Sequence, residues 1–170
     1  MLPIMLAPHS LRIGVAGAGE GLAKRLCLLD EAGVAAREVY DSHLPSDAEI
    51  AALHILFIAG LDEAAAMALA ASARKVGVLV NVEDKPELCD FHVPAIVRRG
   101  DLLLTVSTGG RSPGLAHLLR RELERRFGPE WSGRMEEIAA LRRALRAQGV
   151  PAGEITARTR AMLDEKGWMS

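Results

Sequence analysis

Between residues 11 and 82, short apolar runs containing β-branched residues alternate with stretches whose apolar residues recur at helical spacing. The strand-like runs are residues 11–16, 34–40, 54–59 and 76–82, and the helix-like stretches are 22–32, a short one after Ser46, and 63–75. Strands that alternate with helices favour right-handed βαβ units, which build a parallel sheet with helices on both faces. The alternation therefore predicts an α/β fold for this half of the chain.

The pattern changes after residue 82. Residues 95–99 and 102–107 look like two short strands around Gly100–Asp101, a step that suits a tight hairpin turn. Ser112 followed by Pro113 is typical of a helix start, and that helix is expected to end before Gly128. Two further helices are expected at about residues 133–148 and 154–166. The second half is therefore predicted to be a hairpin followed by helices.

Composition excludes several classes of protein. The 170 residues carry a net charge of −1, which argues against nucleic-acid binding. Apolar runs are too short to cross a membrane, and the first ten residues lack the basic region of a secretory signal. Cys27 and Cys89 are far apart, and no metal-ligand spacing of cysteine or histidine is present. We expect a cytoplasmic protein without a membrane partner, a disulfide framework or a resident metal.

Three glycines, Gly17, Gly19 and Gly21, lie between the first predicted strand and the first helix. Glycines at such a turn allow backbone N–H groups to approach a pyrophosphate at the helix N-terminus. Asp41 ends the second predicted strand, where a carboxylate accepts the ribose hydroxyls of NAD and repels the extra phosphate of NADP. Leu22 stands where a full fingerprint has Gly or Ala. A turn without a nucleotide is the alternative, but the combination with Asp41 favours dinucleotide binding.

Two later sequence motifs are not required by an α/β fold in general. Residues 81–84 read Asn-Val-Glu-Asp, and residues 107–110 read Ser-Thr-Gly-Gly. Following the glycine turn in this order, the segments resemble the precorrin-2 dehydrogenase family, which includes stand-alone enzymes and the N-terminal module of sirohaem synthase. The resemblance covers roughly residues 11–128. It implies NAD-dependent oxidation of precorrin-2 to sirohydrochlorin, and in some members insertion of ferrous iron to give sirohaem.

The resemblance also implies an architecture. The family has a Rossmann-like domain, a dimerisation hairpin and a small C-terminal helical domain, assembled as a homodimer. By analogy, the expected division is 1–83, 84–112 and 113–170. The stretch between Asp41 and His54 is short for the family, so the parallel sheet is expected to be reduced and to lack an edge strand.

Site residues follow from the resemblance position by position. Asp84 matches the catalytic aspartate, although on local sequence alone it is better explained as a helix cap before Lys85–Pro86. The expected cofactor-binding residues are Gly17, Gly19, Glu20, Gly21, Asp41 and Ser42. The expected tetrapyrrole-binding residues are Thr108, Gly109, Arg111, Ser112 and His117. The substrate is a polycarboxylate, and residues 98–146 carry eleven arginines against six acidic residues; a solvated helix face is the alternative explanation of that charge.

Some positions depart from the family pattern. Residues 59–62 read Ala-Gly-Leu-Asp where Ala-Thr-Asp-Asp is usual. The departure leaves open a non-catalytic dimer that binds a tetrapyrrole or NAD, or a chelatase that has lost dehydrogenase activity. An NAD-dependent oxidoreductase for another polyanionic substrate is a further alternative.

Overall fold

The computed structural model of the chain describes residues 2–169 and separates into two compact units. The first unit ends at Val93 and the second begins at Pro94. Within residues 2–169, no helix has both the length and the apolar character needed to span a membrane. The three-part division expected from the sequence remains a prediction.

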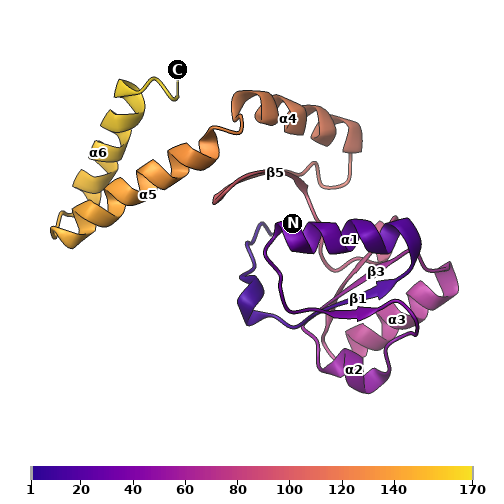
Figure 1. The fold of residues 1–170 in the computed structure, drawn as a ribbon. Helices are drawn as coiled ribbons and strands as arrows, with labels where there is room; N and C mark the ends of the chain where they lie inside the picture. The colour runs from indigo at the N-terminus through magenta and orange to yellow at the C-terminus, as the bar shows by residue number, and fades with distance from the viewer. Residues whose placement is uncertain (1, 170) are drawn as a thin grey trace. The chain divides into compact units, whose positions relative to one another are not determined.

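The first unit contains a four-stranded parallel sheet with the strand order β2-β1-β3-β4. Its central strands β1 and β3 are labelled in Figure 1. Its strands are β1 (Ile13–Gly17), β2 (Glu38–Tyr40), β3 (Ile55–Ala59) and β4 (Leu79–Val82). Its α-helices are α1 (Gly19–Glu31), α2 (Asp47–Ala51) and α3 (Glu63–Lys75). Every residue of β1 and of β3 is buried, as expected for central strands covered on both faces. The predicted α/β fold with a Rossmann-like sheet is confirmed.

The sheet is also reduced in the way the sequence predicts. After β2 the chain forms only the five-residue helix α2 before it enters β3, so β2 is the edge strand on that side. Ser46 begins α2 with a reciprocal cap: its hydroxyl accepts from the Glu49 amide, and the Glu49 carboxylate accepts from the Ser46 amide at 2.8 Å. This cap lets a very short helix reverse the chain direction.

Each face of the sheet has its own aliphatic core. Under α1, Val15 and Phe57 pack with the helix residues Leu22 and Leu29. Leu22, the departure from the fingerprint, is only 8% exposed and belongs to this core. The opposite face packs against α2 and α3, and its buried residues include Ile50, Leu56, Ile58, Ala70 and Val80.

The Ser46–Glu49 cap gives a pH-dependent prediction. Hydrogen bonds from Ser46 hold the pKa of Glu49 below its usual value. Because the folded pKa is depressed, the stabilisation is present above the unfolded pKa and is lost as the pH falls through the folded one. We expect Glu49→Gln to lower the urea midpoint at neutral pH, with the difference from the parent protein shrinking below about pH 4. If the urea midpoints of the two proteins differed as much below about pH 4 as at neutral pH, the ionised Glu49 carboxylate would not be the group that stabilises the cap.

The second unit contains an antiparallel hairpin of β5 (Ala95–Arg99) and β6 (Leu102–Val106), followed by three helices. The helices are α4 (Pro113–Arg126), α5 (Trp131–Ala147) and α6 (Ala152–Glu165) (Figure 1). Ser112 caps α4 by accepting from the Leu115 amide, with Pro113 in the first turn. Helix α4 packs on both strands of the hairpin, and α5 packs against α6. The predicted hairpin and helical region are confirmed.

Several arginines of this unit are used within it. Arg120 and Arg125 each pair with a glutamate about one turn away on α4, and the Arg99 Nε donates to the Phe127 carbonyl at 2.9 Å. The Arg134 guanidinium lies 5.1 Å from the ring centroids of both Trp131 and Trp168, so it joins the start of α5 to the residues after α6. These contacts favour the helix-face explanation for part of the basic charge, whereas Arg111 is exposed and makes no ion pair within residues 2–169.

Candidate functional site

Four segments with polar or glycine residues meet at the carboxyl edge of the parallel sheet. They are the residues that follow the four strands: 18–19 after β1, 41–42 after β2, 60–62 after β3 and 83–84 after β4. The chain runs from β1 to β2 on one side, whereas β3 lies on the other side of β1, so the strand order reverses at the β1–β3 boundary. In open parallel sheets, ligands bind at the carboxyl ends beside such a reversal.

At this boundary the turns after β1 and β3 touch backbone to backbone. A Cβ on Gly17 would lie 1.9 Å from the Ala59 carbonyl oxygen, and a Cβ on Gly60 would lie 2.1 Å from the Ala18 carbonyl oxygen. The Ala18 amide donates to the Ala59 carbonyl at 3.1 Å. Gly60 also has a φ of +66°, a conformation that favours glycine. The glycine in the Ala-Gly-Leu-Asp departure is therefore required by packing, which sequence reasoning missed.

Gly19 differs from Gly17 because it faces open space. It has a φ of +60°, and an added Cβ would meet no heavy atom within 4 Å. Gly19 is the first residue of α1, and the preceding residue, Ala18, provides no side-chain cap. The start of this 13-residue helix is therefore uncrowded at Gly19, and its first amides are available to an anion such as a pyrophosphate group.

Glu20 and Lys24 form an exposed ion pair along α1, with the Lys24 Nζ 3.0 Å from Glu20 Oε1. The hydrogen bond and charge of Glu20 raise the pKa of Lys24, and the charges of Glu83 and Asp84 raise it further. Lys24 is thus a cation close to the acidic residues that follow β4. Nothing in the local sequence marks Lys24, because only the fold brings α1 near the residues after β4.

Asp41 and Ser42 are exposed at the end of β2, the strand that pairs with β1. The register places Tyr40 opposite Ala16, so Asp41 follows its strand close to where the glycine turn follows β1. The structure therefore brings the predicted cofactor residues of both segments to one edge. Burial raises the pKa of the Tyr40 phenol, which belongs to the core beneath this edge.

Asp84 is the only non-glycine residue within 2–169 that has a positive φ, +55°. It is exposed and lies two residues beyond β4. The local expectation of a helix cap does not hold, because the 3₁₀ helix Pro86–Leu88 begins after Lys85, without a side-chain cap. A left-handed non-glycine residue costs about 1–3 kcal/mol and persists where surrounding structure imposes it. The conformation marks Asp84 as a candidate functional residue.

The loop that carries Asp84 is closed by the two residues that follow the 3₁₀ helix. The Cys89 thiol accepts from the Val82 amide at 3.2 Å and donates toward the carbonyls of Val82 and Lys85. Asp90 bonds to both backbone groups of Val80, and its side chain pairs with Arg74 at 2.9 Å. Cys89 and Asp90 thus hold the loop and cover the edge of β4. The part of the chain that the structure describes has no cluster of three or more potential metal ligands.

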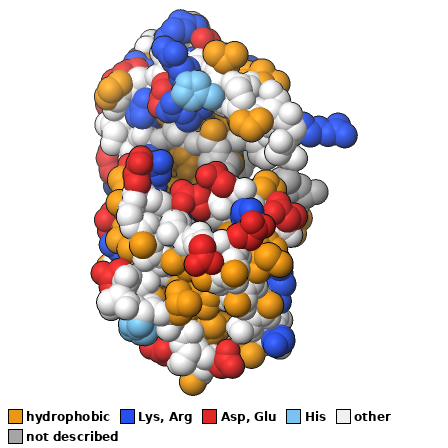
Figure 2. Space-filling view, turned by 90° about the vertical axis from the view of Figure 1, so that its right-hand side faces the viewer, with side chains coloured by type: hydrophobic (Ala, Val, Ile, Leu, Met, Phe, Trp, Pro, Cys, Tyr) orange, Lys and Arg blue, Asp and Glu red, His pale blue; other side chains and the backbone are white. Residues whose placement is uncertain are grey.

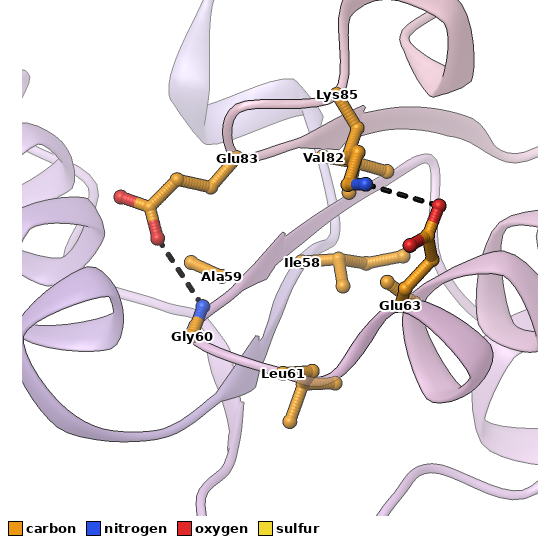
Figure 3. A pocket seen from close by; sticks show the side chains of 9 residues that line it. Ile58, Ala59, Gly60, Leu61, Glu63, Val82, Glu83 and Lys85 are labelled. Carbon is orange, nitrogen blue, oxygen red and sulfur yellow. Dashed lines mark hydrogen bonds and ion pairs between the residues drawn. The ribbon is translucent and has the colours of Figure 1, made fainter.

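A small pocket lies where β3 and β4 end (Figure 3). Lys85 and Glu63 pair across it at 3.0 Å, and the Glu83 side chain reaches to the Gly60 amide at 3.2 Å. Asp62 caps α3 by accepting from the Ala65 amide at 2.9 Å. Asp62, the acidic residue of the Ala-Gly-Leu-Asp segment, therefore serves as the N-cap of α3.

The predicted substrate residues form a separate turn in the second unit. The Thr108 hydroxyl donates to the Ser112 carbonyl at 3.0 Å and accepts from the Ser112 amide at 3.1 Å. Gly109 and Gly110 both have positive φ, so the chain reverses tightly before α4. Arg111 and His117 are exposed. Thr108 and Ser112 thus shape the turn, whereas Arg111 and His117 remain accessible to a ligand.

The fold and the glycine-lined edge define a Rossmann-like protein of the nucleotide-binding type. The family model described as "Putative NAD(P)-binding" matches residues 4–95, and the model described as "Sirohaem biosynthesis protein central" matches residues 99–126. The chain therefore belongs to the NAD(P)-binding family that the first model describes, and its residues 99–126 are similar to the central segment of sirohaem biosynthesis proteins.

Individual relatives agree with this assignment. The chain is 34% identical over 168 residues to a siroheme synthase of Methylococcus capsulatus, a match that covers 88% of this chain and 35% of the relative. It is 36% identical over 157 residues to that of Methylobacillus flagellatus, covering 82% and 33%. The chain thus spans about a third of these curated relatives. A solved structure titled "SirC, precorrin-2 dehydrogenase" shares the fold with a TM-score of 0.75 at 17% identity, covering all of this chain and 93% of that one.

Proposed function

We propose that the protein oxidises precorrin-2 to sirohydrochlorin with NAD⁺, in the cytoplasm, for the synthesis of sirohaem or cobalamin. The observation that carries the proposal is the exposed, left-handed Asp84 at the same sheet edge as the open glycine turn. Strained residues concentrate at functional sites, and ligands bind at this edge of parallel sheets. The similarity to siroheme synthases supports the choice of substrate.

The residues at the edge fit a dinucleotide. The turn at Gly17 and Gly19 presents backbone N–H groups to the diphosphate, and Asp41 accepts the hydroxyls of the adenine ribose. When bound, NAD⁺ supplies the hydride acceptor. Asp84 takes the proton that the substrate loses, because its exposed carboxylate is available as a general base. In the second unit, the exposed side chains of Arg111 and His117 are available to an anionic ligand such as a polycarboxylate.

An anaerobic assay tests the activity. Purified protein is mixed with precorrin-2 and NAD⁺, and NADH formation is followed together with the sirohydrochlorin spectrum. Both signals are expected to rise with many turnovers per protein. Folded protein that binds the tetrapyrrole but produces no NADH would contradict the dehydrogenase and favour the second function below.

Asp41 gives a prediction on cofactor choice. Its carboxylate is exposed at the end of β2 and would repel the 2′-phosphate of NADP. We expect NAD⁺ to give a KM at least about tenfold below that of NADP⁺. Asp41→Ser should reduce the ratio of the KM for NADP⁺ to the KM for NAD⁺. The control Asp47→Ser, which removes the same charge on α2, should leave this ratio unchanged. Equal preference in the parent protein would show that Asp41 does not select the cofactor.

A second function, sirohydrochlorin ferrochelatase or a non-catalytic tetrapyrrole carrier, is favoured by the reduced sheet. In a chelatase, ferrous iron is a substrate and Asp84 receives the pyrrole protons. Protein that inserts iron into sirohydrochlorin without forming NADH from precorrin-2 would support it. Binding of tetrapyrrole without either reaction would leave only the carrier.

We also propose that the chain forms a homodimer. Helix α4 exposes Leu115, Leu118 and Leu119 to the extent of 48%, 63% and 43%. Leu118 and Leu119 are three and four residues from Leu115, so each lies on the same side of the helix as Leu115. Sedimentation velocity is expected to give twice the chain mass.

A further inference from the structure

The carboxylate of Glu83 lies at the junction between the glycine turn and the turn after β3. Its Oε2 accepts from the Gly60 amide at 3.2 Å. A Cβ on Gly21 would lie 2.2 Å from the same oxygen, so the carboxylate rests against the first turn of α1. Figure 3 shows the side chain extending from the end of β4 to the Gly60 amide. Glycine at position 21 thus provides the space that Glu83 uses.

This position is where the proposed cofactor would place negative charge. The first turn of α1 carries unpaired amides and the positive end of the helix dipole, which attract an anion. In the proposed function, that anion is the diphosphate of the dinucleotide. Glu83 already brings a negative charge to this turn and engages the neighbouring Gly60 amide. A carboxylate and a diphosphate repel each other when they approach the same small region.

We propose, resting on the proposed function, that Glu83 is an internal competitor of the cofactor diphosphate, so that a dinucleotide binds fully only when the Glu83 carboxylate leaves Gly60 and the first turn of α1. Lys24 offers the displaced carboxylate a partner, because it lies on the next turn of α1 and now pairs with the exposed Glu20 at 3.0 Å. Glu83 therefore lowers the affinity for the cofactor, and binding depends on movement of the Glu83 side chain away from Gly60.

Isothermal titration of the full chain with NAD⁺ and with ADP-ribose tests this proposal. ADP-ribose keeps the diphosphate and lacks the nicotinamide. Glu83→Gln keeps the shape and removes the charge, and we expect it to bind both ligands about tenfold more tightly at low salt. The gain should shrink as salt is added, because screening weakens the repulsion in the parent protein. Glu83→Asp keeps the charge and is expected to gain much less.

Glu87→Gln is the matched control, because it makes the same charge change on the 3₁₀ helix that follows the loop. Its affinities are expected to equal those of the parent. Parent protein that binds NAD⁺ while Glu83→Gln gains nothing, or binds more weakly, would overturn the competitor role and leave the proposed function standing. Binding by Glu83→Gln but not by the parent would support the competitor role and count against the dehydrogenase. No binding by either protein would reject both.

Discussion

Replacement of Asp84 by asparagine is expected to lower the turnover of precorrin-2 by at least about 100-fold while the fold is kept. General bases typically contribute factors of 10²–10⁴, and asparagine cannot take the proton. Asparagine also tolerates the left-handed conformation that residue 84 adopts at φ +55°. The measurement is kcat for NADH formation, with circular dichroism and NAD⁺ affinity as checks that the variant is folded and binds.

A second variant separates the base from the backbone. Asp84→Gly removes the carboxylate and also relieves the left-handed conformation. We expect Asp84→Gly to be as inactive as Asp84→Asn. Its free energy of unfolding should be about 1 kcal/mol higher than that of the parent protein, which would show as a higher urea midpoint. Full activity in either variant would end the proposal that Asp84 is the base.

The second large effect is expected at Gly17. In Gly17→Ala, the new methyl group would lie 1.9 Å from the Ala59 carbonyl oxygen, so β1 and β3 would have to separate at the centre of the sheet. Because backbone atoms on both sides form the contact, no side chain can move to relieve it. We expect a loss of at least about 3 kcal/mol of unfolding free energy, or failure of the first unit to fold. Urea unfolding followed by circular dichroism measures it.

Gly19→Ala provides the matched control two residues later. Its Cβ would meet nothing within 4 Å, so only the conformational cost of φ +60° applies, about 1–2 kcal/mol. If the proposed function holds, the same methyl group would face the diphosphate, so we expect Gly19→Ala to weaken NAD⁺ binding more than it weakens the fold. Equal destabilisation by the two substitutions would show that β1 and β3 are not in tight contact at Gly17.

Most of the fold was predictable because local signals agree with one another along the chain. Buried-strand runs such as residues 54–59 contain no polar residue beyond the first, and the Ser112–Pro113 pair defines a helix start through its own side chains. The short connection after Asp41 predicted the reduced sheet, because too few residues remain for another strand. The glycine turn and Asp41 were likewise recognisable, since each follows a strand at a characteristic position.

The remainder of the site depends on contacts between distant residues. Gly60 must be glycine because Ala18 lies against it, and Glu83 reaches Gly21 from a strand that begins far later in the sequence. The local sequence around Asp84 indicates a helix cap, whereas the Cys89 thiol bonds fold the loop so that Asp84 adopts the left-handed region instead. No pattern within one segment reports such contacts.

The aromatic contact around Arg134 has an optical consequence. The chain has two tryptophans, Trp131 and Trp168, and both stand beside this guanidinium in the second unit. Intrinsic indole emission therefore reports on the second unit alone, and its change during urea unfolding follows that unit without an added label.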